Sequence, residues 1–310
     1  MNLFRSLLGL TPLLLSHSLS AAPFDYTVAP VAEGIYYHQG LYEEANTDNM
    51  GAIANVSFVI GDKCVAIIDA GGSFAEGQAL RDAVRQHTDK PICYVIDTHV
   101  HPDHLLGSAA FKEDHPEYIG HEHLPKAIAS REEFYARNFA EILGDAYTGT
   151  EFIQPTQTVK PGKPLTIDLG QRKLTLTAYS TSHTDNDLTV FDQKTKTLWT
   201  GDLLFINHIP VLDGSINGWI KNSEVLANLD VTYVVPGHGP ASKDLWQQGW
   251  EKQLHYLRSI RDQIRQIVAV LGTIEQATDS VGLEEKDNWK LFENYHRRNV
   301  TAAFVELEWE

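Results

Sequence analysis

The chain has 310 residues, and 43% of them are hydrophobic, so it can bury a substantial core and is not a disordered chain. The 41 acidic residues outnumber the 25 basic ones, and the formal net charge is −16. Because a nucleic-acid backbone and an anionic membrane surface both require a basic face, neither is expected as the main partner. The length fits one large α/β domain or two smaller ones.

The first 20 residues have the layout of a secretory signal peptide. The basic residue Arg5 precedes a leucine-rich run over residues 7–15, and small residues follow up to Ser20. The apolar run is too short to span a bilayer. We therefore expect residues 1–20 to be a signal peptide and residues 21–310 to form a single mature domain. The protein is expected to be periplasmic or secreted, without membrane contact after signal removal.

Short strand-like and helix-like segments alternate from about Tyr26 onward. Strands are predicted where β-branched and apolar residues cluster in the first half, at residues 52–60, 64–70 and 91–98. Residues 73–88 carry apolar side chains at helical spacing, and Ser73 is the expected N-cap. A second helix is expected to begin near Pro102, because proline at the first helical position loses no hydrogen bond.

The second half repeats this plan. Two strand pairs are predicted, one at residues 165–179 and one formed by residues 188–192 and 197–202. A helix at residues 221–229, a strand at residues 231–239 and a long amphipathic helix at residues 243–271 are expected to follow. Groups of strands covered by helices, twice over and with no linker between them, predict an α/β fold. The layer pattern favours a four-layer αββα sandwich.

The two cysteines, Cys64 and Cys93, each open an apolar run that is predicted to be a strand. Neither lies in a CxxC motif or near the histidines, so both are poor candidates for metal ligands. An oxidising compartment would permit a disulfide between them. Two buried free thiols are nevertheless the favoured interpretation.

Residues 97–104 read DTHVHPDH, which places three histidines and two aspartates in eight positions. His99 and His101 are two residues apart, so in extended backbone they point the same way and can share one metal ion. Asp103 and His104 follow the bend at Pro102 and can face a second ion beside the first. A solvated, histidine-rich loop is the alternative interpretation.

Ligand-type residues also follow three predicted strands further along the chain, at His183, Asp202 and His238. In layered α/β folds the ends of such strands converge on one edge. Six or seven ligands at one edge are more than one divalent ion needs and are enough for two. Nitrogen and oxygen ligands without a thiolate suit zinc, and iron or manganese would also fit.

The segment HVHPDH, together with these downstream residues, resembles the ligand set of the metallo-β-lactamase-fold hydrolases. The segment AIIDAGG resembles the first motif of that superfamily. More narrowly, GAIANVSFVIG, DKPICYVIDTHVHPDH, LDGSINGW and YHRRNVTAAFVELEWE resemble the exported quinoprotein relay system zinc metallohydrolases, which are SoxH-like.

The resemblance implies a role for each residue of the motif. His99, His101 and His183 would bind the first of two Zn²⁺ ions. The second ion would be bound by Asp103, His104 and His238, and Asp202 would bridge both ions, while Asp69 would brace the metal loop.

The resemblance further implies an exported dinuclear zinc hydrolase with a small-molecule substrate. A metal-bridging hydroxide would attack the carbonyl of an ester, thioester or lactam, and Asp103 would protonate the leaving group. A periplasmic quinoprotein or sulfur-oxidation system is the expected partner. Two alternatives stay open: a metallo-β-lactamase that hydrolyses β-lactam antibiotics, and a metal-binding accessory protein without catalysis. The sequence predicts no oligomeric state.

Other polar residues receive weaker assignments. His121 is expected either to border the pocket or to be an ordinary surface histidine. The loop that contains Asn207, His208 and Asp213 could line the substrate cleft or be an ordinary surface loop. The adjacent Arg297 and Arg298 are interpreted as a solvated helix face. Solvated histidines are expected at His38, His87, His115 and His255, and core aromatics at Trp246, Trp250 and Tyr256.

Overall fold

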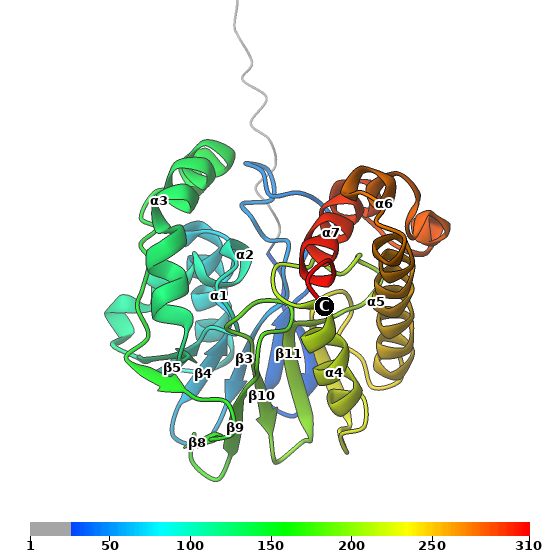
Figure 1. Ribbon diagram of the computed structural model, residues 1–310. Helices are drawn as coiled ribbons and strands as arrows, with labels where there is room; N and C mark the ends of the chain where they lie inside the picture. Colours follow the sequence, from blue (N-terminus) through cyan, green and yellow to red (C-terminus); the bar gives the residue numbers. More distant parts are fainter. Residues whose placement is uncertain (1–25) are drawn as a thin grey trace, which may run out of the picture.

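The structure, a computed structural model, describes residues 26–310, so the predicted signal peptide at residues 1–20 lies outside the described part. Two β-sheets stack face to face, and helices cover both outer faces (Figure 1). This arrangement confirms the predicted αββα sandwich. No helix within residues 26–310 is long and apolar enough to cross a membrane.

The first sheet carries seven strands in chain order. They are β1 (Ala29–Ala32), β2 (Ile35–His38), β3 (Val56–Ile60), β4 (Val65–Ile68), β5 (Ile92–Ile96), β6 (Glu117–His121) and β7 (Gln157–Val159). Neighbours are antiparallel from β1 to β4 and parallel from β4 to β7. The parallel strands therefore share one edge for their carboxyl ends.

The second sheet has five strands. They are β8 (Leu165–Asp168), β9 (Lys173–Ala178), β10 (Leu188–Asp192), β11 (Thr197–Phe205) and β12 (Tyr233–His238). Their order is β12-β11-β10-β9-β8, in which β11 and β12 pair in parallel and the other neighbours are antiparallel. The predicted hairpin around Gly170 is the β8–β9 pair.

Helices pack on the two outer faces. They are α1 (Phe74–His87), α2 (Pro102–Leu105), α3 (Leu124–Leu143), α4 (Ile216–Leu226), α5 (Trp246–Ala269), α6 (Ile274–Ser280) and α7 (Phe292–Leu307). Figure 1 shows α1 to α3 on one side of the sheets and α4 to α7 on the other.

Apolar side chains fill the space between the sheets and the space under the helices. Ile68 and Ile96 of the first sheet share one buried cluster with Val190 of the second. A second cluster under α4, α5 and α7 contains Trp246, Trp250 and Tyr256, as predicted. Each fully buried aliphatic side chain of this kind stabilises the fold by about 1.5–3 kcal/mol. This packing fixes the strand ends that carry the polar residues described below.

Local signals place several elements where the sequence predicts them. The Ser73 hydroxyl caps α1 by accepting a hydrogen bond from the Glu76 amide at 3.0 Å. Pro102 begins α2, but this helix ends at Leu105, and residues 108–114 form a separate 3-10 helix. Helix α3 was not predicted from the sequence, although its apolar residues recur at helical spacing and Pro125 lies in its first turn.

The expectation for the solvated histidines is wrong for one of the four. His38 ends β2, is 5% exposed, and its Nδ1 lies 2.8 Å from the Thr27 carbonyl oxygen. The other three are exposed, namely His87, His115 and His255. Burial of His38 follows from its position on a strand that packs between β1 and β3.

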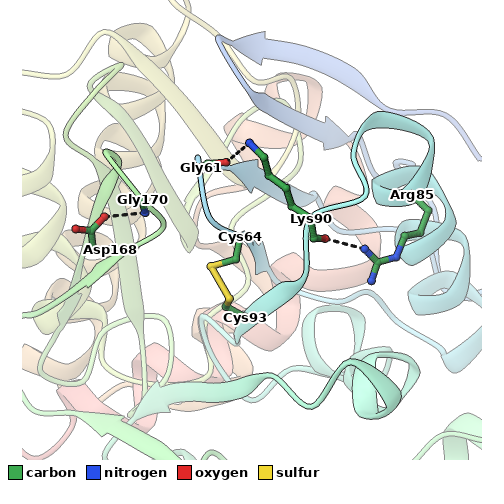
Figure 2. The surroundings of a disulfide bond; sticks show 7 residues. All are labelled: Gly61, Cys64, Arg85, Lys90, Cys93, Asp168 and Gly170. Carbon is green, nitrogen blue, oxygen red and sulfur yellow. Dashed lines mark hydrogen bonds between the residues drawn. A yellow bond between two sulfur atoms is a disulfide. The ribbon is translucent and has the colours of Figure 1, made fainter.

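The structure corrects the favoured interpretation of the cysteines: Cys64 and Cys93 form a disulfide (Figure 2). Cys64 directly precedes β4, and Cys93 lies at the start of the parallel neighbour β5. Parallel pairing brings their Cα atoms to 5.8 Å, within the range that a disulfide requires. The bond lies at the amino ends of these strands, whereas the polar cluster follows their carboxyl ends.

Replacing both cysteines with alanine is expected to lower the free energy of unfolding by about 2–4 kcal/mol, because the disulfide restrains the unfolded chain. The bond closes a loop over a sequence separation of 29 residues. Urea unfolding of the Cys64→Ala/Cys93→Ala variant measures the effect, with reduced wild-type protein as the matched control. Equal stability of the variant and the oxidised wild type would contradict this expectation.

Candidate metal centre

Seven histidine and aspartate side chains gather at the edge of the sandwich where the strands end. They are His99, His101, Asp103, His104, His183, Asp202 and His238. His99 and His101 lie in the turn between β5 and α2, and Asp103 and His104 lie in α2 itself. The others lie in the β9–β10 loop, within β11 and at the end of β12. The structure thus brings together every residue that the sequence predicts as a metal ligand.

Four of these residues, namely His99, His101, His183 and Asp202, form one group whose ligand atoms lie within 4.8 Å of one another. Nε2 of His183 lies 3.0 Å from Nδ1 of His101 and 3.3 Å from Oδ2 of Asp202. Nε2 of His99 lies 3.6 Å from the same Asp202 oxygen. This group could hold one metal ion.

A second group of ligand atoms, from Asp103, His104 and His238, also lies within 4.8 Å. Nε2 of His104 and Nε2 of His238 face Oδ1 of Asp202, at 3.1 and 3.4 Å. Nε2 of His238 also lies 3.3 Å from Oδ2 of Asp103. One oxygen of Asp202 therefore faces each group, which is the arrangement that a bridging carboxylate requires.

The donor atoms of the centre fit divalent metal ions. Nε2 of His99, Nε2 of His104 and Oδ1 of Asp202 are buried, and within residues 26–310 their ion-pair contacts with one another and with neighbouring ligands include no hydrogen bond of good geometry. Buried polar atoms without a partner are costly, and metal ions would satisfy all three. Imidazole nitrogens and carboxylate oxygens suit zinc, and also iron or manganese.

Opposing electrostatic effects act on the histidines of the metal-free centre. Burial, together with the nearby His104, lowers the pKa of His99 to about 4. Burial also disfavours the charged form of His238, but the carboxylates of Asp202 and Asp103 outweigh it and raise the pKa to about 9. A metal ion must displace a proton from His238, so metal binding weakens as the pH falls.

A neighbouring polar atom holds the second ring nitrogen of every histidine in the centre. These contacts are His99 Nδ1 to Thr98 Oγ1 (3.0 Å), His101 Nε2 to Asp213 Oδ2 (3.2 Å), His104 Nδ1 to Asp69 Oδ2 (2.8 Å), His183 Nδ1 to the Val211 oxygen (2.5 Å) and His238 Nδ1 to the Ile53 oxygen (2.9 Å). Such partners fix the tautomer and aim the other nitrogen at a metal ion.

Asp69 connects both groups of ligands. It follows β4 with a positive φ of 55° and accepts hydrogen bonds from the backbone N (2.7 Å) and the hydroxyl (2.8 Å) of Thr98. It also accepts a hydrogen bond from Nδ1 of His104, while the Thr98 hydroxyl contacts Nδ1 of His99. This geometry is what the predicted bracing role of Asp69 requires.

A cavity of about 550 Å³ opens beside the centre, a size typical of small-molecule sites. Asp103 and Asp202 line it, together with residues of α3, α7 and the loop after β11. Of the weaker candidates, His208 and Asp213 line this cavity. His121 is buried instead, with Nε2 at 3.0 Å from the Tyr179 oxygen.

Sequence reasoning missed two cavity-lining arginines. Arg131 lies on α3, which the sequence analysis did not predict. Arg298 is exposed, as expected for a solvated helix face, and it also lines the cavity and contacts Asp213. The neighbouring Arg297 is exposed as predicted and pairs with Asp279. The helical spacing of residues 124–143 was the only signal that could have revealed the α3 wall.

The first turn of α1 contains an acid, Glu76, which is fully buried and accepts a hydrogen bond from the Gly72 amide at 2.7 Å. Burial raises the pKa of Glu76 from 4.5 to about 8, so the carboxyl is protonated at neutral pH in the folded protein. Its folded pKa lies above its unfolded pKa, so the folded state loses stability as the pH rises from about 5 to about 8.

Glu76→Gln is therefore expected to gain stability over the wild type as the pH rises, by at most about 1.4 kcal/mol per pH unit. Urea unfolding of metal-free protein at the two ends of this pH range measures the difference. The exposed Glu132, changed to glutamine, is the matched control and should show no such trend. A pH-independent difference for Glu76→Gln would rule out the buried neutral acid.

The fold and the cluster define a class, the αββα proteins with a histidine- and aspartate-rich site that could hold metal ions. A family model for the metallo-beta-lactamase superfamily matches residues 50–238, more than half of the chain. The chain belongs to the metallo-beta-lactamase superfamily, whose members bind metal ions and are typically hydrolytic enzymes. No curated protein matches the sequence.

Solved structures show the same fold at low sequence identity. A metallo-beta-lactamase from Pontibacter korlensis has a TM-score of 0.58 at 18% identity and covers 76% of this chain and 99% of its own. The metallo-beta-lactamase DIM-1 has a TM-score of 0.59 at 16% identity, covering 77% and 99%. A double mutant of the sec-alkyl sulfatase PisA1 has a TM-score of 0.69 at 15% identity, covering 91% of this chain and 50% of its own.

Proposed function

We propose that the protein is an exported, dinuclear zinc-dependent hydrolase that cleaves an ester, thioester or lactam. The observation that carries this proposal is the position of Asp202, whose two carboxylate oxygens face two separate groups of ligands. A centre built for one ion would not need a buried carboxylate shared in this way. Bound metal ions would supply activation of water and polarisation of the carbonyl of the substrate.

The residues of the chain would then bind the substrate and move protons. Asp103 lies at the rim, and its side chain is 15% exposed toward the cavity. Burial would raise the pKa of Asp103, but His104 and His238 hold it well below its usual value, so the carboxylate is ionised. An ionised carboxylate is the form that can accept a proton, so we propose that Asp103 takes up a proton released in the reaction and passes it to the leaving group.

Two observations support export and a periplasmic role. The Cys64–Cys93 disulfide is of a kind that persists in oxidising compartments such as the periplasm. The signal-like layout of residues 1–20 points the same way. The motif resemblance to SoxH-like quinoprotein relay system proteins makes a periplasmic quinoprotein or sulfur-oxidation system the proposed partner.

The test combines metal content with turnover on mature protein purified without added metal. We expect about two zinc ions per chain and hydrolysis of at least one p-nitrophenyl ester, acyl thioester or nitrocefin. Turnover of nitrocefin alone would favour a β-lactamase. Two tightly bound ions without any turnover would instead favour the metal-binding accessory protein, and a chain that binds no metal would refute the proposal.

Asp103→Asn is expected to lower kcat by about a hundredfold or more, because asparagine keeps a ligand oxygen but cannot carry a proton. Metal content measured on the same sample separates loss of the proton carrier from loss of an ion. The matched control is Asp145→Asn in the exposed 3-10 helix (Gly144–Tyr147) that follows α3, which should behave like the wild type. Unchanged turnover of every substrate by Asp103→Asn would exclude its role.

A further inference from the structure

Two arginines from opposite sides of the fold meet over the candidate metal centre. Arg131 of α3 and Arg298 of α7 both line the cavity, and both reach the carboxylate of Asp213. The distances are 3.4 Å from Arg131 Nη2 to Oδ2 and 3.5 Å from Arg298 Nη2 to Oδ1. Figure 1 shows α3 and α7 standing on either side of the site edge.

Asp213 is not free to neutralise both guanidinium groups. Its Oδ2 also lies 3.2 Å from Nε2 of His101, so the same carboxylate orients a candidate metal ligand. The guanidinium groups of Arg131 and Arg298 thus share one carboxylate, Asp213, which also contacts His101. These two positive charges stand out in a chain whose net charge is −16.

The contacts of the arginines are too loose to explain their placement as a structural ion pair. Charge-assisted N–H···O bonds are usually about 2.7–2.9 Å long, shorter than either contact to Asp213. The side chains of Arg131 and Arg298 are 29% and 55% exposed, and exposed pairs of this kind contribute little to stability. A guanidinium has five N–H donors in a planar fork, and each contact to Asp213 uses one Nη atom.

The wall next to Arg131 is apolar. Tyr135 and Phe139 line the cavity from α3, and Phe134 and Ile142 line it while remaining 56% and 39% exposed. Exposed large apolar side chains beside a polar centre are typical of a surface that contacts the apolar part of a ligand. The cavity therefore offers metal-ligand residues, an apolar wall and two cationic groups within one space.

We propose that Arg131 and Arg298 bind a carboxylate of the substrate, at a position removed from the bond that is cleaved. The substrate would be an amphiphilic acyl compound whose apolar body lies along α3 and whose free carboxylate lies between the two guanidinium groups. Their planar forks match carboxylate geometry. This inference rests on the proposed hydrolase function and adds the substrate class to it.

The test compares two p-nitrophenyl esters of similar size, the butyrate, which is neutral, and the glutarate monoester, which keeps a free carboxylate. The wild type is expected to prefer the charged ester in kcat/KM. Arg131→Gln and Arg298→Gln should each lower the ratio of charged to neutral kcat/KM by about tenfold, mainly through KM.

Each variant has a matched control with the same charge change on the same helix. Arg297→Gln removes the neighbour of Arg298, which pairs with Asp279 and does not line the cavity. Arg137→Gln removes an exposed arginine of α3. Neither control should change the ratio. A ratio that falls equally in Arg298→Gln and Arg297→Gln would reflect net charge and overturn the carboxylate site.

Calorimetric titration with the anilides that correspond to the two esters separates this inference from the proposed function. Glutaric acid monoanilide should bind the wild type more tightly than butyranilide, and Arg298→Gln should abolish the difference. If no p-nitrophenyl ester, acyl thioester or nitrocefin is cleaved but this binding pattern holds, the hydrolase proposal fails and the carboxylate site stands. If both esters are cleaved with equal kcat/KM and the anilides bind equally, the hydrolase stands and the carboxylate site is wrong.

Discussion

Asp202→Asn is expected to lower kcat/KM by about a hundredfold to a thousandfold and to reduce the metal content from two ions per chain to one or fewer. Asparagine offers one carbonyl oxygen, whereas the two carboxylate oxygens of Asp202 face two groups of histidines. The amide also removes the negative charge that offsets two divalent ions. Metal analysis and turnover on the same preparation measure both effects.

A longer carboxylate is not expected to rescue this site. The backbone of Gly237 passes so close that a Cβ atom placed on it would lie 1.9 Å from Oδ1 of Asp202. Asp202→Glu should therefore lose metal as well, because the longer side chain has no room. Asp230→Asn, at an exposed position, is the control for the loss of one charge. Two ions retained in Asp202→Asn would mean that Asp202 does not bridge them.

The sequence predicted the candidate ligands because their signals are local. The motif HVHPDH lies in one turn, His183 follows an apolar run that reads as a strand, and His238 ends another. Asp202 was predicted at the end of a strand, but β11 continues past it to Phe205. A rule about strand ends then brings distant residues together without any knowledge of side-chain packing. The structure confirms the sandwich and places all seven residues at one edge.

The cavity walls could not be predicted in the same way. Arg131 and Arg298 belong to ordinary amphipathic helices. Which face of each helix meets the site depends on tertiary packing, such as that of α7 against α5 and α6. The disulfide shows the same limit. The separation of Cys64 from Cys93 along the chain carries no pairing signal, and only the register of β4 against β5 brings them into range.

Asp69→Asn is expected to weaken metal binding by about tenfold to a hundredfold while preserving the local backbone. Asn tolerates the positive φ of position 69, so the turn after β4 can persist. The amide offers only one acceptor oxygen where the carboxylate accepts from Thr98 and from His104. Because Thr98 also holds His99, the substitution should disturb one ligand of each group.

The neighbouring Asp97 provides a matched control inside the same core. It accepts a hydrogen bond from the Ser108 hydroxyl at 2.9 Å, and burial raises its pKa to about 8, so it is already neutral at pH 7. Asn resembles this protonated acid, and Asp97→Asn should therefore bind metal nearly as the wild type does. Titration of both variants with zinc in the presence of a competing chelator measures the contrast. Equal metal affinities of Asp69→Asn and Asp97→Asn would show that the hydrogen bonds from Asp69 to Thr98 and His104 do not strengthen metal binding.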